Sequence, residues 1–403
     1  MRRFVVSLIG SLLAFNVFWS LDSAAQRGGG AGGQSGRGAA ATILPRAGVG
    51  GADLSSGPYE PVTDWPIHDW AKPGYIWGSQ SGIFPETPNR VFLASRGELK
   101  VPGTPPPNFN GVWAALGLGG ATTPLPEFRN CIVIVDGKGK MIESWTQWDH
   151  LFEGGRGPHQ IYISPYDPER RVWVVDDMRH VIFIFSNDGK KLLKTLGELD
   201  EFGDNDDEKR FRRPTDIAWL PDGTFFVADG YGNKRVVKFD KDGHFLKRAM
   251  SGAPTPFNTV HGIAVAGSPP RVFVSDRGNR RIQVFDTDLN FIEYWPDIAP
   301  HTIVASADGH IWAYDQTSEK MAKFDLSGHL EYAFGTSGVN GNGRDQTKFW
   351  GVHQIAADSD GNLYVAEVFN GRADKFVPRA GADPKTLVWG QPLMPKRAAP
   401  AGN

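Results

Sequence analysis

The sequence of 403 residues is short of several features that would define other classes of protein. It has one cysteine, Cys131, which excludes an intramolecular disulfide and any metal site built from several thiolates. It has no basic excess, because 43 Lys and Arg stand against 45 Asp and Glu. We therefore expect no nucleic-acid partner. Long amphipathic helical patterns of the α/β folds are missing as well. Any metal must then be held by histidines and carboxylates.

The one long apolar run lies at the N-terminus. Arg2 and Arg3 precede apolar residues 4–21, and small residues follow at 23–25. This pattern predicts a signal peptide over residues 1–25, cleaved after Ala25, with an uncleaved anchor as the alternative. We expect an exported protein, periplasmic or secreted, with no membrane contact after cleavage. Residues 26–58 are rich in Gly, Ala and Ser and predict a flexible linker, and residues 392–403 predict a C-terminal tail.

Between these ends the chain repeats itself. Five similar segments each read as a short apolar strand, a turn, an alternating strand ending in Asp or Glu, a polar loop and a third strand; they begin at Pro158, Pro214, Val260, Pro300 and Val352. A short fourth strand follows in most copies. A divergent sixth copy surrounds an insertion at residues 98–130, with its second strand after Asn89 and its third from Cys131.

Six such units predict an all-β fold, a six-bladed β-propeller over residues 59–391 with four antiparallel strands per blade. The copies resemble NHL repeats, a likeness that concerns the fold, since NHL propellers include many non-catalytic binding platforms.

Histidine recurs at one position of the repeat. The second residue of each first strand reads, in order, His159, Thr215, His261, His301 and His353. The first strand of every blade lines the central channel of a propeller, so side chains at its entrance point toward the axis near one face. Four histidines in five copies exceed what composition would give.

Three of these histidines suggest a metal site. His159, His261 and His353 belong to alternate blades, so their imidazoles should converge on the axis. Three His ligands with one open position are typical of catalytic zinc. The alternative is that the rings bond channel water or backbone. His301 lies in the same column outside this symmetry, and we interpret it as a residue that lines the channel or supports the metal ligands without binding the metal.

The ends of the second strands should lie on the same face. The acidic residues that end them are interpreted as turn-closing groups. One position later, only two blades carry arginine, Arg96 and Arg277, and Tyr231 follows two residues after the acid of the third blade. Guanidinium groups bind carboxylates, and a phenol beside a metal and cations can serve as a base. Together with the three histidines, these side chains suit a small substrate with a carboxylate and a metal-binding oxygen. Alternatively, the arginines pair with blade carboxylates and the tyrosine only packs.

At these residues the chain resembles the peptidyl-α-hydroxyglycine α-amidating lyases. Four stretches carry the likeness, among them "FRRPTDIAWLPDGTFFVADGYGNKRVVKF" and "VHGIAV". The resemblance implies a Zn²⁺ held by His159, His261 and His353. It also implies Tyr231 as the base and Arg96 and Arg277 at the substrate, a peptidyl-α-hydroxyglycine that is cleaved to an amide and glyoxylate.

One departure concerns a second metal. The family's structural Ca²⁺ uses an aspartate directly after the third histidine, together with backbone carbonyls such as that of Ile161. This chain has Gln354 there, a neutral and weaker ligand, which argues against calcium.

Two other functions remain open at this point. One is a non-catalytic NHL propeller that binds protein or glycan, and the other is a lactonase-like metal-dependent hydrolase. We expect a monomer that acts on a small carboxylate-bearing or peptide substrate.

Overall fold

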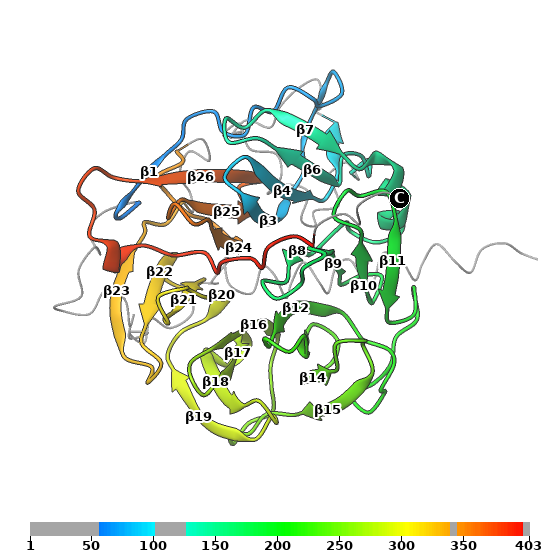
Figure 1. Cartoon of the computed structure of the whole chain (residues 1–403), viewed down its shortest axis with the longest axis vertical. Helices are drawn as coiled ribbons and strands as arrows, with labels where there is room; N and C mark the ends of the chain where they lie inside the picture. The colour runs from blue at the N-terminus through cyan, green and yellow to red at the C-terminus, as the bar shows by residue number, and fades with distance from the viewer. Residues whose placement is uncertain (1–55, 101–125, 339–344, 398–403) are drawn as a thin grey trace, which may run out of the picture.

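The computed structural model of the chain describes residues 56–100, 126–338 and 345–397. Several sequence-based expectations concern residues outside these ranges: the signal peptide (1–25), most of the linker (26–55), most of the insertion (101–125) and the end of the tail (398–403). The described residues form six four-stranded antiparallel sheets, arranged as blades around a central channel (Figure 1). The six-bladed β-propeller is confirmed.

The innermost strand of each blade follows the predicted register. From blade 1 to blade 6 these strands are β3 (Gln80–Thr87), β8 (Gln160–Ile163), β12 (Pro214–Trp219), β16 (Val260–Ala266), β20 (Pro300–Ala305) and β24 (Val352–Ala357). The second strands are β4 (Arg90–Ser95), β9 (Val172–Asp176), β13 (Phe225–Asp229), β17 (Arg271–Asp276), β21 (Ile311–Asp315) and β25 (Leu363–Glu367). Runs of Val, Ile and aromatic residues favour these buried strands.

Two further strands complete each blade. The third strands are β6 (Ile132–Val135), β10 (Val181–Phe185), β14 (Arg235–Phe239), β18 (Arg281–Asp286), β22 (Lys320–Phe324) and β26 (Arg372–Pro378). The outermost strands are β7 (Met141–Ser144), β11 (Leu192–Leu196), β15 (Phe245–Ala249), β19 (Phe291–Pro296), β23 (Leu330–Phe334) and β1 (Tyr59–Pro61).

The ring closes through blade 6, which combines both ends of the propeller sequence. Strand β1 pairs antiparallel with β26, placing Tyr59 opposite Pro378. A small two-stranded sheet of β2 (Tyr75–Trp77) and β5 (Glu98–Lys100) flanks blade 1. The helices of the described residues are short 3₁₀ turns, namely η2 (Thr146–Phe152), η3 (Arg277–Asn279) and η4 (Pro384–Thr386). No helix in the described ranges is both long and apolar enough to cross a membrane.

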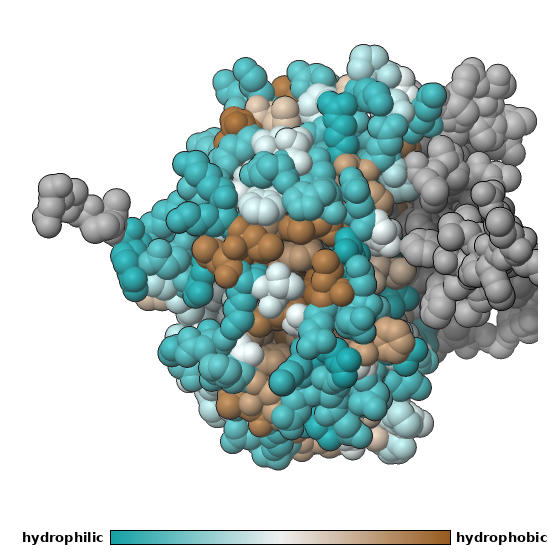
Figure 2. Space-filling model, turned by 90° about the vertical axis from the view of Figure 1, so that its right-hand side faces the viewer, coloured by the Kyte–Doolittle hydropathy of each residue, from teal (hydrophilic) through white to brown (hydrophobic). Residues whose placement is uncertain are grey.

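The hydrophobic core lies between neighbouring blades. One cluster joins Phe92 and Ile134 of blade 1 to Val174 and Phe183 of blade 2, all of them buried. This packing between blades leaves the inner strands free to present polar side chains to the channel. Figure 2 views the outer side of the ring, where hydrophilic residues cover most of the surface around a central apolar area.

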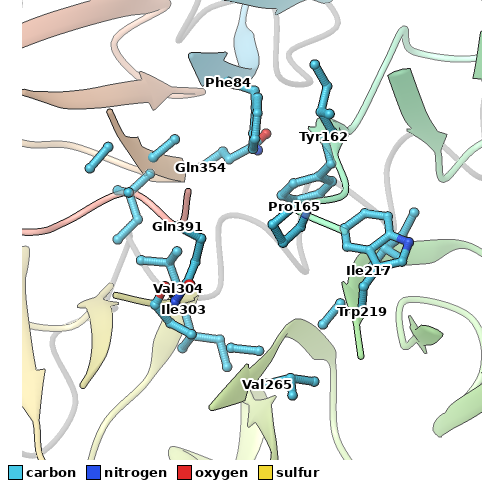
Figure 3. Close-up of a pocket in the computed structure, with 18 of the residues that line it drawn as sticks. Phe84, Tyr162, Pro165, Ile217, Trp219, Val265, Ile303, Val304, Gln354 and Gln391 are labelled. Carbon is cyan, nitrogen blue, oxygen red and sulfur yellow. Dashed lines mark hydrogen bonds between the residues drawn. The ribbon is translucent and has the colours of Figure 1, made fainter. Parts of the chain in front are cut away.

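The carboxyl ends of the inner strands surround an apolar pocket at one end of the channel. Phe84, Tyr162, Trp219, Val265 and Ile303 approach it from different blades (Figure 3). The C-terminal segment runs across this end of the channel (Figure 1).

Backbone hydrogen bonds fix that segment to three blades. They join Trp389 to Ala307, Gly390 to Asp358 and Met394 to Pro165. Residues 392–397, the described part of the expected tail, are thus bonded to the propeller, and the histidine end is the opposite end of the channel.

Candidate metal centre and active site

The histidine column lies on a series of β-bulges. In five of the six blades, pairing between the first and second strands shifts register at the start of the first strand. The bulged residues include His261, His301 and His353. A β-bulge adds a residue and re-aims its side chain, which explains how this position faces the axis although it lies in a strand.

Three imidazoles meet at the axis. One ring nitrogen each from His159, His261 and His353 lies within 4.8 Å of the others, and all three side chains are fully buried. Their ring centroids are 4.4–5.2 Å apart. The structure therefore brings together the three histidines that the alternate-blade spacing singled out.

Backbone carbonyls orient two of these rings. Nδ1 of His159 is 2.9 Å from the carbonyl oxygen of Thr215, and Nδ1 of His353 is 2.7 Å from that of Ser81. Both acceptors occupy the histidine-column position of the next blade. With the proton on Nδ1, Nε2 of each ring presents its lone pair toward the axis, and neither Nε2 has a hydrogen-bond partner within the described ranges.

Burial lowers the pKa of each of these imidazoles well below its ordinary value, and Arg96 and Arg277 act in the same direction. Neutral imidazole is the form that binds a metal. Buried, neutral and convergent nitrogens of this kind fit Zn²⁺, which favours His₃ sets with an open fourth position.

His301 lies beside this trio. Its ring centroid is 4.6 Å from that of His261 and 5.3 Å from that of His353. It is buried, and burial lowers its pKa well below the ordinary value. The three-histidine group with mutually close ligand atoms does not include it.

Tyr231 reaches the centre from the loop between β13 and β14. Its hydroxyl oxygen lies 2.8 Å from Nε2 of His261, and its ring centroid is 5.3 Å from that of His159. Arg277, in η3, places its guanidinium carbon 5.6 Å from the centre of the tyrosine ring.

Arg96 approaches from the opposite side, directly after β4, and its side chain is buried. Its backbone packs against Gly157, where φ is +87° and an added Cβ would come within 2.8 Å of the Arg96 Cα. Glycine at position 157 thus permits the close approach of Arg96 to the segment that carries His159.

Three further charged residues surround the tyrosine, and the sequence analysis did not single them out as site residues. Arg156 and Arg213 place their guanidinium carbons 5.4 and 4.8 Å from the centre of the Tyr231 ring. Asp177 accepts hydrogen bonds from both, at 3.0 Å from Arg156 and 2.6 Å from Arg213. Although burial raises it, the pKa of Asp177 is held below its ordinary value by these two arginines. Both arginines precede a first strand, but at different distances from it, so no shared position in the repeat marks them.

The acidic residues that end the second strands have structural partners. Asp229 accepts from the backbone N–H of Arg212, Asp276 from that of Asn258, and Asp315 from that of Ala299, all at 2.8–2.9 Å. Each bond ties the end of the second strand to the residues before the first strand. These contacts are those of turn-closing groups.

The position expected for calcium is occupied by an amide. Nε2 of Gln354 donates to the carbonyl oxygen of Ile161 at 2.8 Å, while its Oε1 accepts from the N–H groups of Ile83 and Ile161 at 3.3 and 3.2 Å. The carbonyl of Ile161, which a cation would need, already accepts a hydrogen bond from Gln354. This donor set does not fit Ca²⁺, which requires several oxygen ligands.

Several known proteins are similar to this chain. The NHL repeat family model matches residues 211–239. The peptidyl-alpha-hydroxyglycine alpha-amidating lyase 1 of Drosophila melanogaster is 28% identical over 57% of this chain and 46% of its own length. The peptidyl-glycine alpha-amidating monooxygenase B of Xenopus laevis is 27% identical over 77% of this chain and 35% of its own length.

This chain spans less than half the length of these curated relatives. Among solved structures, a virginiamycin B lyase from Staphylococcus aureus aligns with 15% identity and a TM-score of 0.46, covering 80% of this chain and 89% of that one. The chain is a six-bladed β-propeller that matches the NHL repeat model at residues 211–239 and resembles the peptidyl-α-hydroxyglycine α-amidating lyases.

Proposed function

We propose that this protein is a zinc-dependent lyase that cleaves the C–N bond of a peptidyl-α-hydroxyglycine, or a similar α-hydroxy amide, to an amide and glyoxylate. The observation that carries the proposal is the trio of buried histidine nitrogens within 4.8 Å of one another, with the Tyr231 hydroxyl on one of them. The amidating-lyase relatives support the choice of reaction.

His159, His261 and His353 would hold the zinc ion. When bound, zinc supplies Lewis-acid stabilisation of negative charge on a substrate oxygen. The carbonyls of Thr215 and Ser81 keep two of the rings turned toward the axis.

Tyr231 acts as the proton acceptor. Its hydroxyl is held by His261 beneath the guanidinium groups of Arg156, Arg213 and Arg277. As the phenolate, Tyr231 takes the proton of the substrate's α-hydroxyl group, the C–O bond becomes a carbonyl, and the C–N electron pair leaves with the amide nitrogen. That nitrogen receives the proton back from the Tyr231 hydroxyl, so the products are a primary amide and an aldehyde acid, and no oxidant is needed.

Arg96 and Arg277 provide positive charge on two sides of the histidine trio. Guanidinium groups bind carboxylates through paired hydrogen bonds, and preorganised charge stabilises a developing anion without reorganisation. This arrangement suits the carboxylate of the hydroxyglycine.

Metal analysis tests the proposal. Purified wild type should contain about one zinc per chain and His261→Ala should contain none. His301→Ala, a buried histidine from the same column, is the matched control and should retain the metal. Release of glyoxylate from an α-hydroxyglycine peptide then tests the reaction. A wild type without zinc favours the binding-module function, and a zinc protein that opens lactones without releasing glyoxylate favours the hydrolase.

A further inference from the structure

Two loop residues occupy equivalent positions on opposite sides of the channel. Tyr231 follows Asp229, the last residue of β13, by two positions, and Phe369 follows Glu367, the last residue of β25, by two positions. Blades 3 and 6 are three positions apart in a ring of six, so the two rings face each other across the axis. One carries a hydroxyl group and the other does not.

The surroundings of the two rings differ in charge. Tyr231 lies among the guanidinium groups of Arg156, Arg213 and Arg277. Phe369 stacks on His301, with centroids 6.4 Å apart and planes at 23°, and Trp350 packs against it at 5.5 Å. Phe369 and Trp350 are both only partly buried. Three guanidinium groups thus gather around Tyr231, and two aromatic rings gather at Phe369 on the opposite side of the channel.

Backbone geometry supports the aromatic side. Gly351 separates Trp350 from Val352, the first residue of β24, and has φ of +69°. A Cβ at this position would collide with the ring of Phe369. Glycine both adopts this conformation readily and leaves the space that the phenylalanine fills.

We propose that Phe369 and Trp350 form an apolar subsite for the side chain of the residue before the hydroxyglycine, so that the preferred substrates carry a large aromatic or aliphatic group there. The inference rests on the proposed function. A substrate whose carboxylate lies toward Arg277 and the other arginines around Tyr231 has its leaving amide on the other side of the histidines, where the two aromatic rings are. Apolar and aromatic contacts at such a subsite contribute affinity for a large side chain and little for a methyl group.

The test compares the turnover of two substrates by the zinc-loaded enzyme. These are N-acetyl-phenylalanyl-α-hydroxyglycine and N-acetyl-alanyl-α-hydroxyglycine. Wild type should prefer the phenylalanyl substrate in kcat/KM by roughly tenfold or more. Phe369→Ala and Trp350→Ala should each reduce that ratio several-fold, and Phe369→Leu should restore most of it. Phe291→Ala, on the outer strand β19, is the matched control and should leave the ratio at the wild-type value.

A binding measurement separates this inference from the proposed reaction. N-acetyl-phenylalanylglycine and N-acetyl-alanylglycine lack the hydroxyl group and cannot react, so calorimetry reports their affinities even if no turnover occurs. Tighter binding of the phenylalanyl compound that Phe369→Ala abolishes supports the subsite, whatever the reaction. Equal affinities in wild type, or a ratio that both aromatic variants leave unchanged, would overturn it, while absent glyoxylate release alone would reject only the lyase.

Discussion

The hydroxyl oxygen of Tyr231 lies 2.8 Å from Nε2 of His261, so the proposed proton acceptor and one proposed zinc ligand share a hydrogen bond. The contact joins the Gly-Tyr-Gly loop of blade 3 to the innermost strand of blade 4. It places the phenol at the axis, where a substrate hydroxyl would meet the histidine trio.

Replacing Tyr231 by phenylalanine should separate chemistry from metal binding. Only a hydroxyl group is lost, and the three histidines are untouched, so the variant should fold and retain zinc. Glyoxylate release should fall by roughly 10²–10⁴, the usual contribution of a positioned general base. Turnover and zinc content measured on the same preparation provide the check, and wild-type turnover would remove Tyr231 from this role.

The arginines should affect substrate binding as well as turnover. Arg96→Ala and Arg277→Ala should each raise KM for an α-hydroxyglycine peptide, because the carboxylate is bound in both the ground state and the transition state. Steady-state kinetics over a range of substrate concentrations would show it. Arg248→Ala on β15 removes a partly exposed guanidinium, paired with Asp206, from the outer strand and is the control. An unchanged KM in both site variants would speak against carboxylate binding there.

Much of this arrangement could be predicted from the repeat. The strand register places Asp229 and Asp276 at the ends of β13 and β17, as the sequence indicated. The same register indicated that His159, His261 and His353 converge, and the structure brings them together. A regular repeat makes positions comparable between blades, so a column of one residue type becomes visible.

What the sequence analysis missed lies where the repeat is irregular. Arg156 and Arg213 precede their strands by different numbers of residues, so they form no column. The first strand of blade 1 was not located, because Gln80 and Ser81 replace the usual start. The bonds of the C-terminal segment to Pro165 and Asp358 depend on tertiary contacts that no local pattern encodes.

Calcium should have no effect on the stability of this protein. The amide of Gln354 bonds the backbone of Ile161 in both directions and leaves no oxygen for a cation there. The thermal midpoint of wild type should therefore be the same in EGTA and in calcium. A midpoint that falls on chelation would contradict the assignment of this position to an amide.

A single substitution should create a calcium response. Gln354→Asp replaces the amide N–H donor by a buried carboxylate that faces the carbonyl of Ile161. The lost hydrogen bond and the unpaired buried charge should lower the free energy of unfolding by about 1–3 kcal/mol or more. Added Ca²⁺ should recover part of the lost stability, because carboxylate and carbonyl oxygens are its ligands. Gln391→Asp, at the exposed C-terminal segment, should show neither effect.

Glu319 should make the stability of the fold depend on pH. This carboxyl group is 6% exposed, and burial, with Glu367 nearby, raises its pKa to about 8, although the N–H of Gly351 partly offsets the shift. Below the ordinary glutamate pKa both the folded and the unfolded chain are protonated, so the shift has no effect. As pH rises, the unfolded chain ionises first, and the folded state loses stability progressively until about pH 8.

Glu319→Gln removes this titration while keeping an oxygen that can accept from Gly351. The difference in unfolding free energy between variant and wild type should therefore grow in favour of the variant from pH 5 to pH 8, by an amount on the order of 3 kcal/mol. Urea unfolding at several pH values measures it, provided that the slope with denaturant is unchanged. Glu201→Gln alters an exposed glutamate and should give a difference independent of pH. A constant difference for Glu319→Gln would mean that the buried carboxyl group ionises at its ordinary pH, since only a shifted titration can make the two curves diverge.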